Sequence, residues 1–508
     1  MTDRRPAPGT ITPPIALEGG EPTGHLLAAP VHVDAAFLDR LSEVCAEVQV
    51  SDGRALAEAG RDWWPLAMTW ALDGDVPGLP SAVARPADTA EVAAVVRLCD
   101  EARVPLTAAG GRSGVSGASV PVHGGVVLDM TAMSGITAVD AVSGTVDVLP
   151  GTFGDALEEE LRGAHGLTLG HWPQSIALST VGGWLACRSA GQLSTRYGKI
   201  EDMVVALEVV LADGTIVETG GAPRAAAGPD LNQLFVGSEG TLGVITSARL
   251  RCHPAPTATR TAAYAFASFA EGIDGLRTIL QRGATPAVAR LYDPIEADRS
   301  WSTGGQAVLL VLDEGDPVLV DATMAVVAEA CAATQPMDAG LVDRWLGHRN
   351  DVSALEALTR KGFVVDTMEI AGPWSQLPAL YDAVLAALQG VDGMRAASAH
   401  QSHSYLDGGC LYFSFAGRPP ADEREDFYVR AWDAATAAAL DGGGALSHHH
   451  GVGLNRSRFM AQALGSGMDV LRSVKVALDP HGILNPGKLG LGSPFGESTW
   501  PSPVPPRS

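Results

Sequence analysis

The sequence is poor in the features that mark exported, membrane-spanning or disulfide-linked proteins. Its 508 residues include six cysteines, and no two of them form a CxxC pair. A scattered set of this kind fits a reducing compartment better than a disulfide framework. No run of about 18 apolar residues occurs, and the first residues, MTDRRPAPGT, lack the apolar stretch of a secretory signal. We therefore expect a cytoplasmic protein with no membrane span.

Basic residues are also scarce relative to acidic ones. The chain has 35 Lys and Arg against 58 Asp and Glu, which gives a formal net charge of −23. Nucleic-acid binding needs clustered positive charge, so we expect no nucleic-acid partner. Hydrophobic residues make up 46% of the chain and charged residues 18%, the balance of a folded globular protein. At this length two or three packed lobes are expected, and an enzyme is compatible with the size.

Glycine is abundant, and it is concentrated in two zones. In the longer zone, residues 170–245, glycines alternate with serines and threonines. Small residues let backbone approach a ligand closely, and hydroxyls satisfy its polar edges. The shorter zone, GGRSGVSG at 110–117, does not match the GxGxxG fingerprint. Alone it is either an ordinary glycine-rich turn or a nest of N–H groups for a diphosphate. Together the two zones favour a ligand that combines a diphosphate with a flat ring.

Helices and strands are predicted in both halves of the chain. Asp34 is expected to cap a helix whose apolar residues include Phe37 and Leu41, and a second helix is expected over 88–102. Thr152 and Asp155 resemble a capping box at the start of another helix. Residues 213–214, Asp-Gly, predict the turn of a β-hairpin. From about residue 256 the glycine density falls, and a second α+β region begins.

Five segments resemble, in order, the motifs of the vanillyl-alcohol-oxidase or p-cresol-methylhydroxylase (PCMH) type of FAD-binding flavoprotein. They are PLTAAGGRSGVSGASVP, GHWPQSIALSTVGGW, RYGKIEDMV, GPDLNQLFVGSEGTLGVIT and DPHGILNPGKLG. Within that superfamily the chain is most similar to alkyldihydroxyacetonephosphate synthase, including the late SHHHGVG. The resemblance implies an α+β fold with a two-lobed FAD-binding PCMH-type domain and an α+β cap domain for the substrate.

The resemblance and the change in composition divide the chain into five parts. Residues 1–79 would be an N-terminal extension with a helix, and 80–255 the FAD-binding PCMH-type domain. Residues 256–445 would be the cap or substrate domain. Residues 446–490 would be a C-terminal segment that returns to the FAD site, and 491–508 a flexible tail.

The resemblance implies FAD as the cofactor and assigns its contacts. One loop would hold the diphosphate, a second segment would face the flavin, and a third would close the site. The implied contacts are Ala109, Gly110, Gly111, Arg112, Ser113, Gln174, Ser175, Ser179, Thr180, Arg188, Ser189, Glu239, Gly240, Thr241, Gly243, Val244 and Ile245. Family members that bind flavin covalently often have His where this chain has Arg112, so we expect non-covalent FAD.

Polar residues of the second half are the candidates for chemistry. Strand alternation places Tyr412, which matches the family's catalytic tyrosine, on the same face as Cys410 and Ser414. A buried structural tyrosine is the alternative. The histidine turn at 448–450 offers imidazoles for proton transfer, with a surface turn or a metal site as alternatives. The predicted catalytic residues are Tyr412, His449, His450, Arg290 and His171, and the predicted substrate contacts are Arg290, His400, His403 and His448.

One window departs from the synthase pattern. Where the synthase has Arg-Val-Thr-Gln-Thr-Tyr-Asp, this chain has HQSHSYL at 400–406, so a titratable imidazole replaces a fixed cation. The change weakens the case for a phosphate-bearing lipid substrate and favours a flavin-linked dehydrogenase of 2-hydroxy acids. Some of those enzymes use a metal near the flavin. Their HxGDGNLH motif is absent here, and we predict no metal site.

These observations predict an FAD-dependent oxidoreductase that acts on a hydroxy acid or a related small alcohol by hydride transfer to flavin N5. Arg290 would hold a carboxylate, Tyr412 and a histidine would take the hydroxyl proton, and Glu369 would orient Arg290 or a histidine. Two alternatives stay open: exchange of an acyl for an alkyl group through a flavin N5 adduct, as in the synthase, and a flavin-binding protein without turnover. The sequence does not specify the electron acceptor, and a homodimer stays open.

Overall fold

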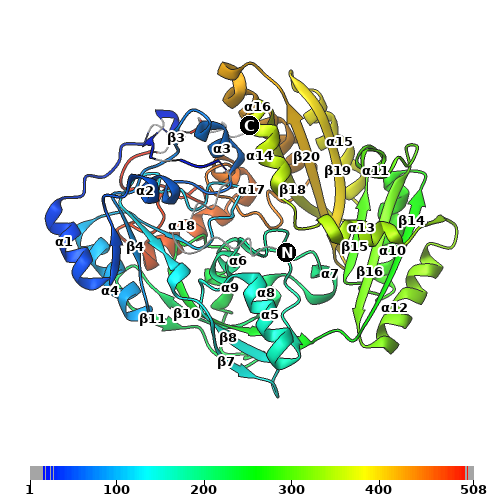
Figure 1. The fold of residues 1–508 in the computed structure, drawn as a ribbon, viewed down its shortest axis with the longest axis horizontal. Helices are drawn as coiled ribbons and strands as arrows, with labels where there is room; N and C mark the ends of the chain where they lie inside the picture. Colours follow the sequence, from blue (N-terminus) through cyan, green and yellow to red (C-terminus); the bar gives the residue numbers. More distant parts are fainter. Residues whose placement is uncertain (1–14, 18, 23, 27, 498–499, 502–508) are drawn as a thin grey trace.

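The computed structural model describes residues 15–17, 19–22, 24–26, 28–497 and 500–501. They form two lobes (Figure 1): one carries the N-terminal segments in blue and cyan together with the C-terminal helices in red, and the other carries the middle of the chain in green and yellow. The tail predicted for 491–508 lies partly outside the described residues.

The first lobe is built on two main sheets. The four-stranded sheet has the order β2-β4-β6-β5, with β4, β5 and β6 parallel. The five-stranded antiparallel sheet has the order β11-β10-β12-β8-β7. The strands are β2 (Glu47–Gln49), β4 (Ala82–Arg85), β5 (Leu106–Ala109), β6 (Val126–Asp129), β7 (Ile136–Asp140), β8 (Thr145–Val148), β10 (Val204–Val210), β11 (Ile216–Glu218) and β12 (Val244–Arg251). Val210 pairs with Ile216 across the Asp-Gly turn, which confirms the predicted hairpin.

Helices and four short strands complete this lobe. They are α1 (Ala35–Val44), α2 (Gly53–Ala59), α3 (Pro65–Ala71), α4 (Thr89–Ala102), α5 (Gly154–His165), α6 (Val181–Cys187), α7 (Ser194–Tyr197), α8 (Ile200–Met203), α9 (Asn232–Phe235), α17 (Met460–Leu464), α18 (Gly467–Leu478), β1 (Glu21–Pro22), β3 (Asp75–Val76), β9 (Leu167–Thr168) and β13 (His253–Pro254). Asp34 caps α1 as predicted, because its carboxylate accepts from the Phe37 N–H at 2.8 Å. The capping box is wrong: Phe153 precedes α5, and the Thr152 hydroxyl donates to the Leu149 carbonyl at 2.7 Å instead.

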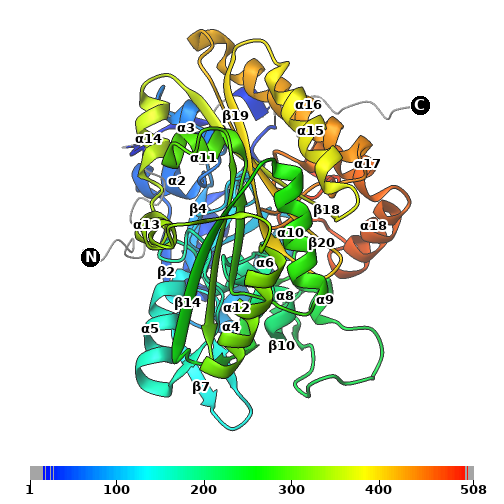
Figure 2. The same ribbon diagram turned by 90° about the vertical axis from the view of Figure 1, so that its right-hand side faces the viewer.

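The second lobe, which we call the cap, is a seven-stranded antiparallel sheet with the order β17-β14-β16-β15-β19-β20-β18. Helices α10, α12 and α15 cover one of its faces (Figure 2). The strands are β14 (Ala258–Phe266), β15 (Val288–Tyr292), β16 (Ala307–Gly315), β17 (Gln335–Met337), β18 (Val364–Pro373), β19 (Met394–Ser404) and β20 (Gly408–Gly417). The helices are α10 (Phe269–Gln281), α11 (Pro294–Trp301), α12 (Pro317–Ala330), α13 (Gly340–His348), α14 (Ser353–Arg360), α15 (Leu377–Gln389) and α16 (Arg424–Asp441).

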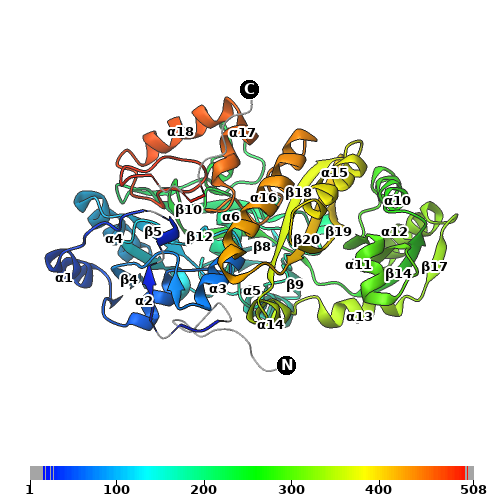
Figure 3. The ribbon, with the colours of Figure 1, turned by 90° about the horizontal axis from the view of Figure 1, so that it is seen from above.

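After α16 the chain returns to the first lobe, where α17 and α18 lie (Figure 3). The Leu106 N–H on β5 donates to the Ile483 carbonyl at 2.8 Å, and Leu106 forms a parallel bridge with Leu484. The region between the lobes is therefore bordered by three parts of the chain: the part that precedes the cap, the cap itself and the part that follows it. In the described part of the chain no helix has the length and apolar character needed to cross a membrane.

Candidate functional site

A cavity of about 760 Å³ lies between the two lobes. Glycine and serine backbone from the first lobe forms one wall, and polar side chains of β15, β18, β19 and β20 form another. A volume of this size accommodates a sizeable small molecule.

At two positions of the first wall, a residue larger than glycine would collide with neighbouring atoms. A Cβ on Gly110 would lie 2.2 Å from Oγ1 of Thr180, and a Cβ on Gly111 would lie 2.0 Å from the carbonyl oxygen of Leu178. The loop that follows β5 is thus packed against the segment that precedes α6. Thr180 Oγ1 and Arg112 Nε are buried in this wall and have no hydrogen-bond partner within the described protein. Such donors beside close-packed backbone suit the diphosphate of a dinucleotide cofactor.

Most of the predicted cofactor contacts meet at this cavity. Those that line it are Ala109, Gly110, Gly111, Arg112, Ser113, Gln174, Ser175, Ser179, Thr180, Ser189, Glu239, Gly240, Gly243, Val244 and Ile245. Arg188 and Thr241 are not among the lining residues. Arg188 reaches Glu201 at 3.5 Å, and the Thr241 hydroxyl donates to the Ser238 carbonyl at 2.7 Å.

The cap wall carries a row of polar side chains on four neighbouring strands. Tyr292 pairs with His400, His400 with Tyr412, and Tyr412 with Glu369. Paired residues lie on the same face of a sheet, and the next residue along each strand points to the other face. Phe413 accordingly packs in the apolar core under the cap helices.

Arg290 is the cation of this wall. Its Nε donates to the Tyr292 hydroxyl at 2.8 Å, and its Nη2 donates to Nε2 of His400 at 2.7 Å. His400 Nδ1 then lies 3.3 Å from Glu296. Burial and the Arg290 charge lower the pKa of His400, so this imidazole is neutral. The guanidinium is therefore oriented by a phenol and an imidazole, and it lines the cavity, where a cation of this kind can bind an anion.

Tyr412 lies against His400, with ring centroids 4.8 Å apart and nearly parallel planes. Its hydroxyl donates to Thr367 Oγ1 at 2.9 Å. Burial raises the pKa of Tyr412, so the phenol keeps its proton. Ser414 lines the cavity on the same face, as strand alternation predicted, whereas Cys410 is fully buried.

Glu369 organises the histidine turn. One carboxylate oxygen accepts the backbone N–H groups of His448, His449 and His450 at 2.9–3.1 Å. The other lies 2.9 Å from Nδ1 of His450, and Arg456 binds both oxygens. Burial by itself would raise the pKa of Glu369, but Arg456 and His450 hold it well below the usual value. Of the two roles predicted for Glu369, it orients a histidine and does not contact Arg290.

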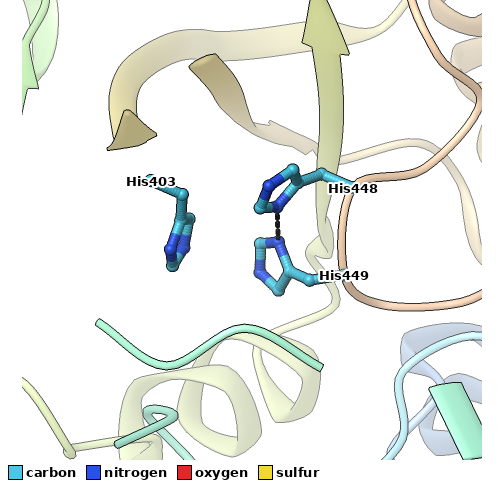
Figure 4. A group of neighbouring side chains, drawn as sticks. All are labelled: His403, His448 and His449. Carbon is cyan, nitrogen blue, oxygen red and sulfur yellow. Dashed lines mark hydrogen bonds between the residues drawn. The ribbon is translucent and has the colours of Figure 1, made fainter. Parts of the chain in front are cut away.

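His403, His448 and His449 form a cluster in which ligand nitrogens lie within 4.8 Å of one another (Figure 4). His403 occupies a bulge of β19 with a left-handed φ of 54°, which turns its ring toward the other two. The Nδ1 atoms of His448 and His449 are 2.8 Å apart, and Nδ1 of His403 is 2.7 Å from Ser194 Oγ. Burial lowers the pKa of all three imidazoles, so they are neutral.

Two of the residues predicted to be catalytic or to bind substrate do not line the cavity. His171 is fully buried, with Nε2 3.2 Å from Ser189 Oγ and its ring 4.6 Å from Trp184. His448 does not line the cavity either, and its Nε2 lies 3.0 Å from the Tyr405 hydroxyl. The predicted residues that line the cavity are Tyr412, His449, His450, Arg290, His400 and His403.

Several residues that line the cavity were not predicted from the sequence. They are Asp62, Trp63, Glu296, Arg299, Thr367, Val352, Leu355 and Leu358. None lies in a recognised motif, and only the fold brings them to the cavity. The two adjacent tryptophans that follow an acidic residue at 62–64 were the one available sign that this segment is buried, because large aromatic side chains at consecutive positions are seldom both exposed to solvent.

Comparison with known proteins agrees with this geometry. Residues 80–220 match the FAD binding domain family, and residues 255–489 match the family of FAD linked oxidases, C-terminal domain. YgcU of Escherichia coli O157:H7, an uncharacterized FAD-linked oxidoreductase, is 32% identical over 483 residues, which cover 90% of this chain and 98% of that protein. The chain belongs to the FAD-linked oxidoreductase family. FAD is its cofactor, and the glycine wall fits it.

Two further relatives of this FAD-linked oxidoreductase carry different names. Alkyldihydroxyacetonephosphate synthase of Dictyostelium discoideum is 32% identical, covering 82% of this chain and 74% of that protein. Glycolate oxidase subunit GlcD of Bacillus subtilis is 28% identical, covering 81% and 89%.

Solved structures confirm the predicted α+β fold and superfamily. A structure of alkyldihydroxyacetonephosphate synthase is 26% identical with a TM-score of 0.74, covering 92% of this chain and 88% of that one. A structure of p-cresol methylhydroxylase with substrate bound is 17% identical with a TM-score of 0.73, covering 92% and 99%, and shows a shared fold.

Replacing Gly111 by Ala should remove bound FAD, because the new Cβ would overlap the Leu178 carbonyl and displace the diphosphate loop. We expect FAD to bind about tenfold more weakly or to be lost on gel filtration, measured by the flavin absorbance of the purified protein. Gly163→Ala in α5 is the control, since its Cβ would meet nothing within 4 Å. Equal flavin content in both variants would contradict the role of the close-packed loop.

Replacing Glu369 by Gln should lower the free energy of unfolding by about 3–5 kcal/mol, because Arg456 stays buried without its partner. The control is Glu329→Gln, which breaks an exposed pair with Arg282 and should change stability by less than about 1 kcal/mol. The Glu369 contribution is fully present above the ordinary pKa of 4.5 and is lost as pH falls through the lowered pKa of the folded state. Denaturant unfolding at several pH values measures this, and an equal loss at all pH values would refute the assigned ionisation.

Proposed function

We propose that this FAD-linked oxidoreductase oxidises a 2-hydroxy acid or a related small alcohol. The observation that carries the proposal is the row of Arg290, His400 and Tyr412 on the cap wall that faces the glycine wall. Arg290 is held by neutral partners, which suits the binding of a substrate carboxylate. The FAD-linked family and the relative named glycolate oxidase subunit support the same class of reaction.

In this proposal the residues of the cap have separate roles in substrate binding and proton transfer. Arg290 fixes the carboxylate, and the protonated Tyr412 hydroxyl hydrogen-bonds the substrate oxygen. His450 accepts the hydroxyl proton at Nε2, and the Glu369 carboxylate 2.9 Å from Nδ1 balances the positive charge that forms. FAD, when bound, supplies the hydride acceptor at N5. His449 lines the same wall and is positioned by His448, whose Nδ1 lies 2.8 Å from its own, whereas His171 positions Ser189 of the opposite wall.

A second candidate is the acyl-for-alkyl exchange of alkyldihydroxyacetonephosphate synthase. It is favoured by an apolar stretch of the same cavity, formed by Val352, Leu355 and Leu358 around α14, which would suit a long alkyl chain. The relative of that name at 32% identity also supports it. The oxidoreductase assignment is preferred because His400, neutral and hydrogen-bonded to Arg290, stands where the synthase motif has a fixed cation. A flavin-binding protein without turnover would leave the polar row without a role.

The partners proposed for the enzyme are a small-molecule substrate and a separate electron acceptor. A homodimer is one of the oligomeric states that stay open. We also propose that FAD is held non-covalently, since family members with covalent flavin often have His where this chain has Arg112. The histidine cluster is proposed to act without a resident metal. Both ring nitrogens of His448 already have partners, Nδ1 of His449 and the Tyr405 hydroxyl, and Nδ1 of His403 lies 2.7 Å from Ser194 Oγ.

Anaerobic addition of D-lactate, D-2-hydroxyglutarate or a related hydroxy acid should bleach the flavin. Tyr412→Phe should slow this bleaching about 10²- to 10³-fold while the protein stays yellow, because the variant loses the hydrogen bond to the substrate oxygen and keeps the cofactor contacts. Tyr264→Phe on β14 is the control and should bleach at the normal rate, since Tyr264 lies outside the cavity lining. No bleaching across the panel, combined with turnover of acyl-dihydroxyacetonephosphate, would establish the second candidate instead.

Precipitation of the purified protein with acid should leave the yellow colour in the supernatant. This is expected because Arg112 offers no nucleophilic side chain to the flavin. Colour retained in the pellet would show a covalent link and would contradict the proposal.

Treatment with a chelator should leave the bleaching rate unchanged, and elemental analysis should find less than about one-tenth of an equivalent of transition metal per chain. The expectation follows from His448, whose Nδ1 lies 2.8 Å from Nδ1 of His449 and whose Nε2 lies 3.0 Å from the Tyr405 hydroxyl, because a ring with both nitrogens engaged has no free lone pair for a metal. Stoichiometric metal that is lost together with activity would refute it.

A further inference from the structure

The short segment between α2 and α3 reaches the cofactor cavity. Its residues Arg61, Asp62, Trp63 and Trp64 are all buried, with exposed fractions of 0–8%. Asp62 and Trp63 line the cavity beside the glycine loop. The segment lies before residue 80, outside both regions that match the FAD-linked families. The part of the chain expected to be only an N-terminal extension therefore contributes to the site.

The first and last residues of this segment have partners within the protein. Arg61 donates to both carboxylate oxygens of Glu58, at 2.7 and 2.8 Å. The Trp64 indole N–H donates to the Tyr428 hydroxyl at 2.9 Å and ties the segment to the cap helix α16. These contacts fix the backbone of the segment, and they direct the two residues between them at the cavity.

Asp62 and Trp63 each keep one buried polar atom without a partner. Asp62 Oδ1 accepts the Trp64 backbone N–H at 3.0 Å, but Asp62 Oδ2 and Trp63 Nε1 accept or donate no hydrogen bond within the described protein. Oδ2 faces the glycine loop, where a Cβ on Gly114 would lie 3.5 Å from it. Burial raises the pKa of Asp62 to about 7, although the Trp64 backbone N–H, the Lys488 charge and the backbone N–H groups of Ser119 and Gly117 act in the opposite direction. Unpaired buried polar atoms destabilise a protein, so a pair of them in a cavity wall indicates a ligand.

The geometry points to Asp62 and Trp63 as a cofactor-binding pair that FAD completes: Asp62 Oδ2 accepts a hydrogen bond from FAD, and the Trp63 indole N–H donates one to it. Adjacent donors and acceptors occur on both halves of FAD, on the pyrimidine edge of the flavin and on the adenine edge. The inference rests on FAD as the cofactor and not on the proposed reaction.

Titration of the apoprotein with FAD tests the pair, with the dissociation constant read from flavin fluorescence. Trp63→Phe removes the indole N–H, and Asp62→Asn replaces the acceptor with an amide N–H or a reoriented carbonyl. Each should raise the Kd of FAD about five- to tenfold, the value of one lost hydrogen bond. The matched control is Trp64→Phe, the same substitution one residue along, which should lower the Tm and leave the Kd within about twofold. An unchanged Kd in Trp63→Phe overturns the inference, and this variant decides the outcome if Asp62→Asn fails to fold.

Titrations with FMN and with ADP identify which half of FAD the pair binds. Weaker binding of FMN by Trp63→Phe assigns the pair to the flavin half, and weaker binding of ADP assigns it to the adenosine half. Either result supports the inference, because both keep the pair in contact with the cofactor. A variant that binds FAD, FMN and ADP as tightly as the unaltered protein contradicts it.

Discussion

The buried ion pair between Glu369 and Arg456 is the interaction on which the arrangement of the site depends. Both side chains are fully buried, and either charge alone would be strongly destabilising in that position. Strand β18 of the cap and the C-terminal segment must therefore meet there. The same carboxylate collects three consecutive backbone N–H groups and the Ser447 hydroxyl, which fixes the turn at 448–450 against the cap sheet. These contacts together place His450 beside Tyr412, with ring centroids 5.5 Å apart.

The two walls of the cavity obey different physical constraints. The wall from the first lobe is made by backbone, and steric exclusion decides its residues, as at Gly110 and Gly111. The wall from the cap is made by side chains, and sheet register decides which of them align, as for His400 and Tyr412. Under the proposed function, FAD binding is thus separated from the binding of the substrate. The family includes relatives with names as different as a synthase and a glycolate oxidase subunit, which agrees with the rule that one fold can host several functions.

Local patterns in the sequence predicted what depends on neighbouring residues. The Asp34 cap, the Asp-Gly hairpin and the shared face of Tyr412 and Ser414 are each decided within a few positions, and each is found. The capping box at Thr152 failed because the Thr152 hydroxyl finds a carbonyl in the preceding turn. His400 shows the limit of reading charge from residue type. The imidazole is titratable in isolation, but burial and Arg290 keep it neutral.

The sequence by itself determined the cofactor, the glycine loops that approach it, and the strand face that carries Tyr412, because these depend on short motifs and on the two-residue period of a strand. Only the tertiary structure decided which polar groups share the cavity. Asp62 and Trp63 lie hundreds of residues from the cap strands β19 and β20, and Glu369 lies 87 positions from Arg456. Contacts over such separations come from the packing of two lobes, in which buried charges and N–H groups must find partners, and no local pattern records them.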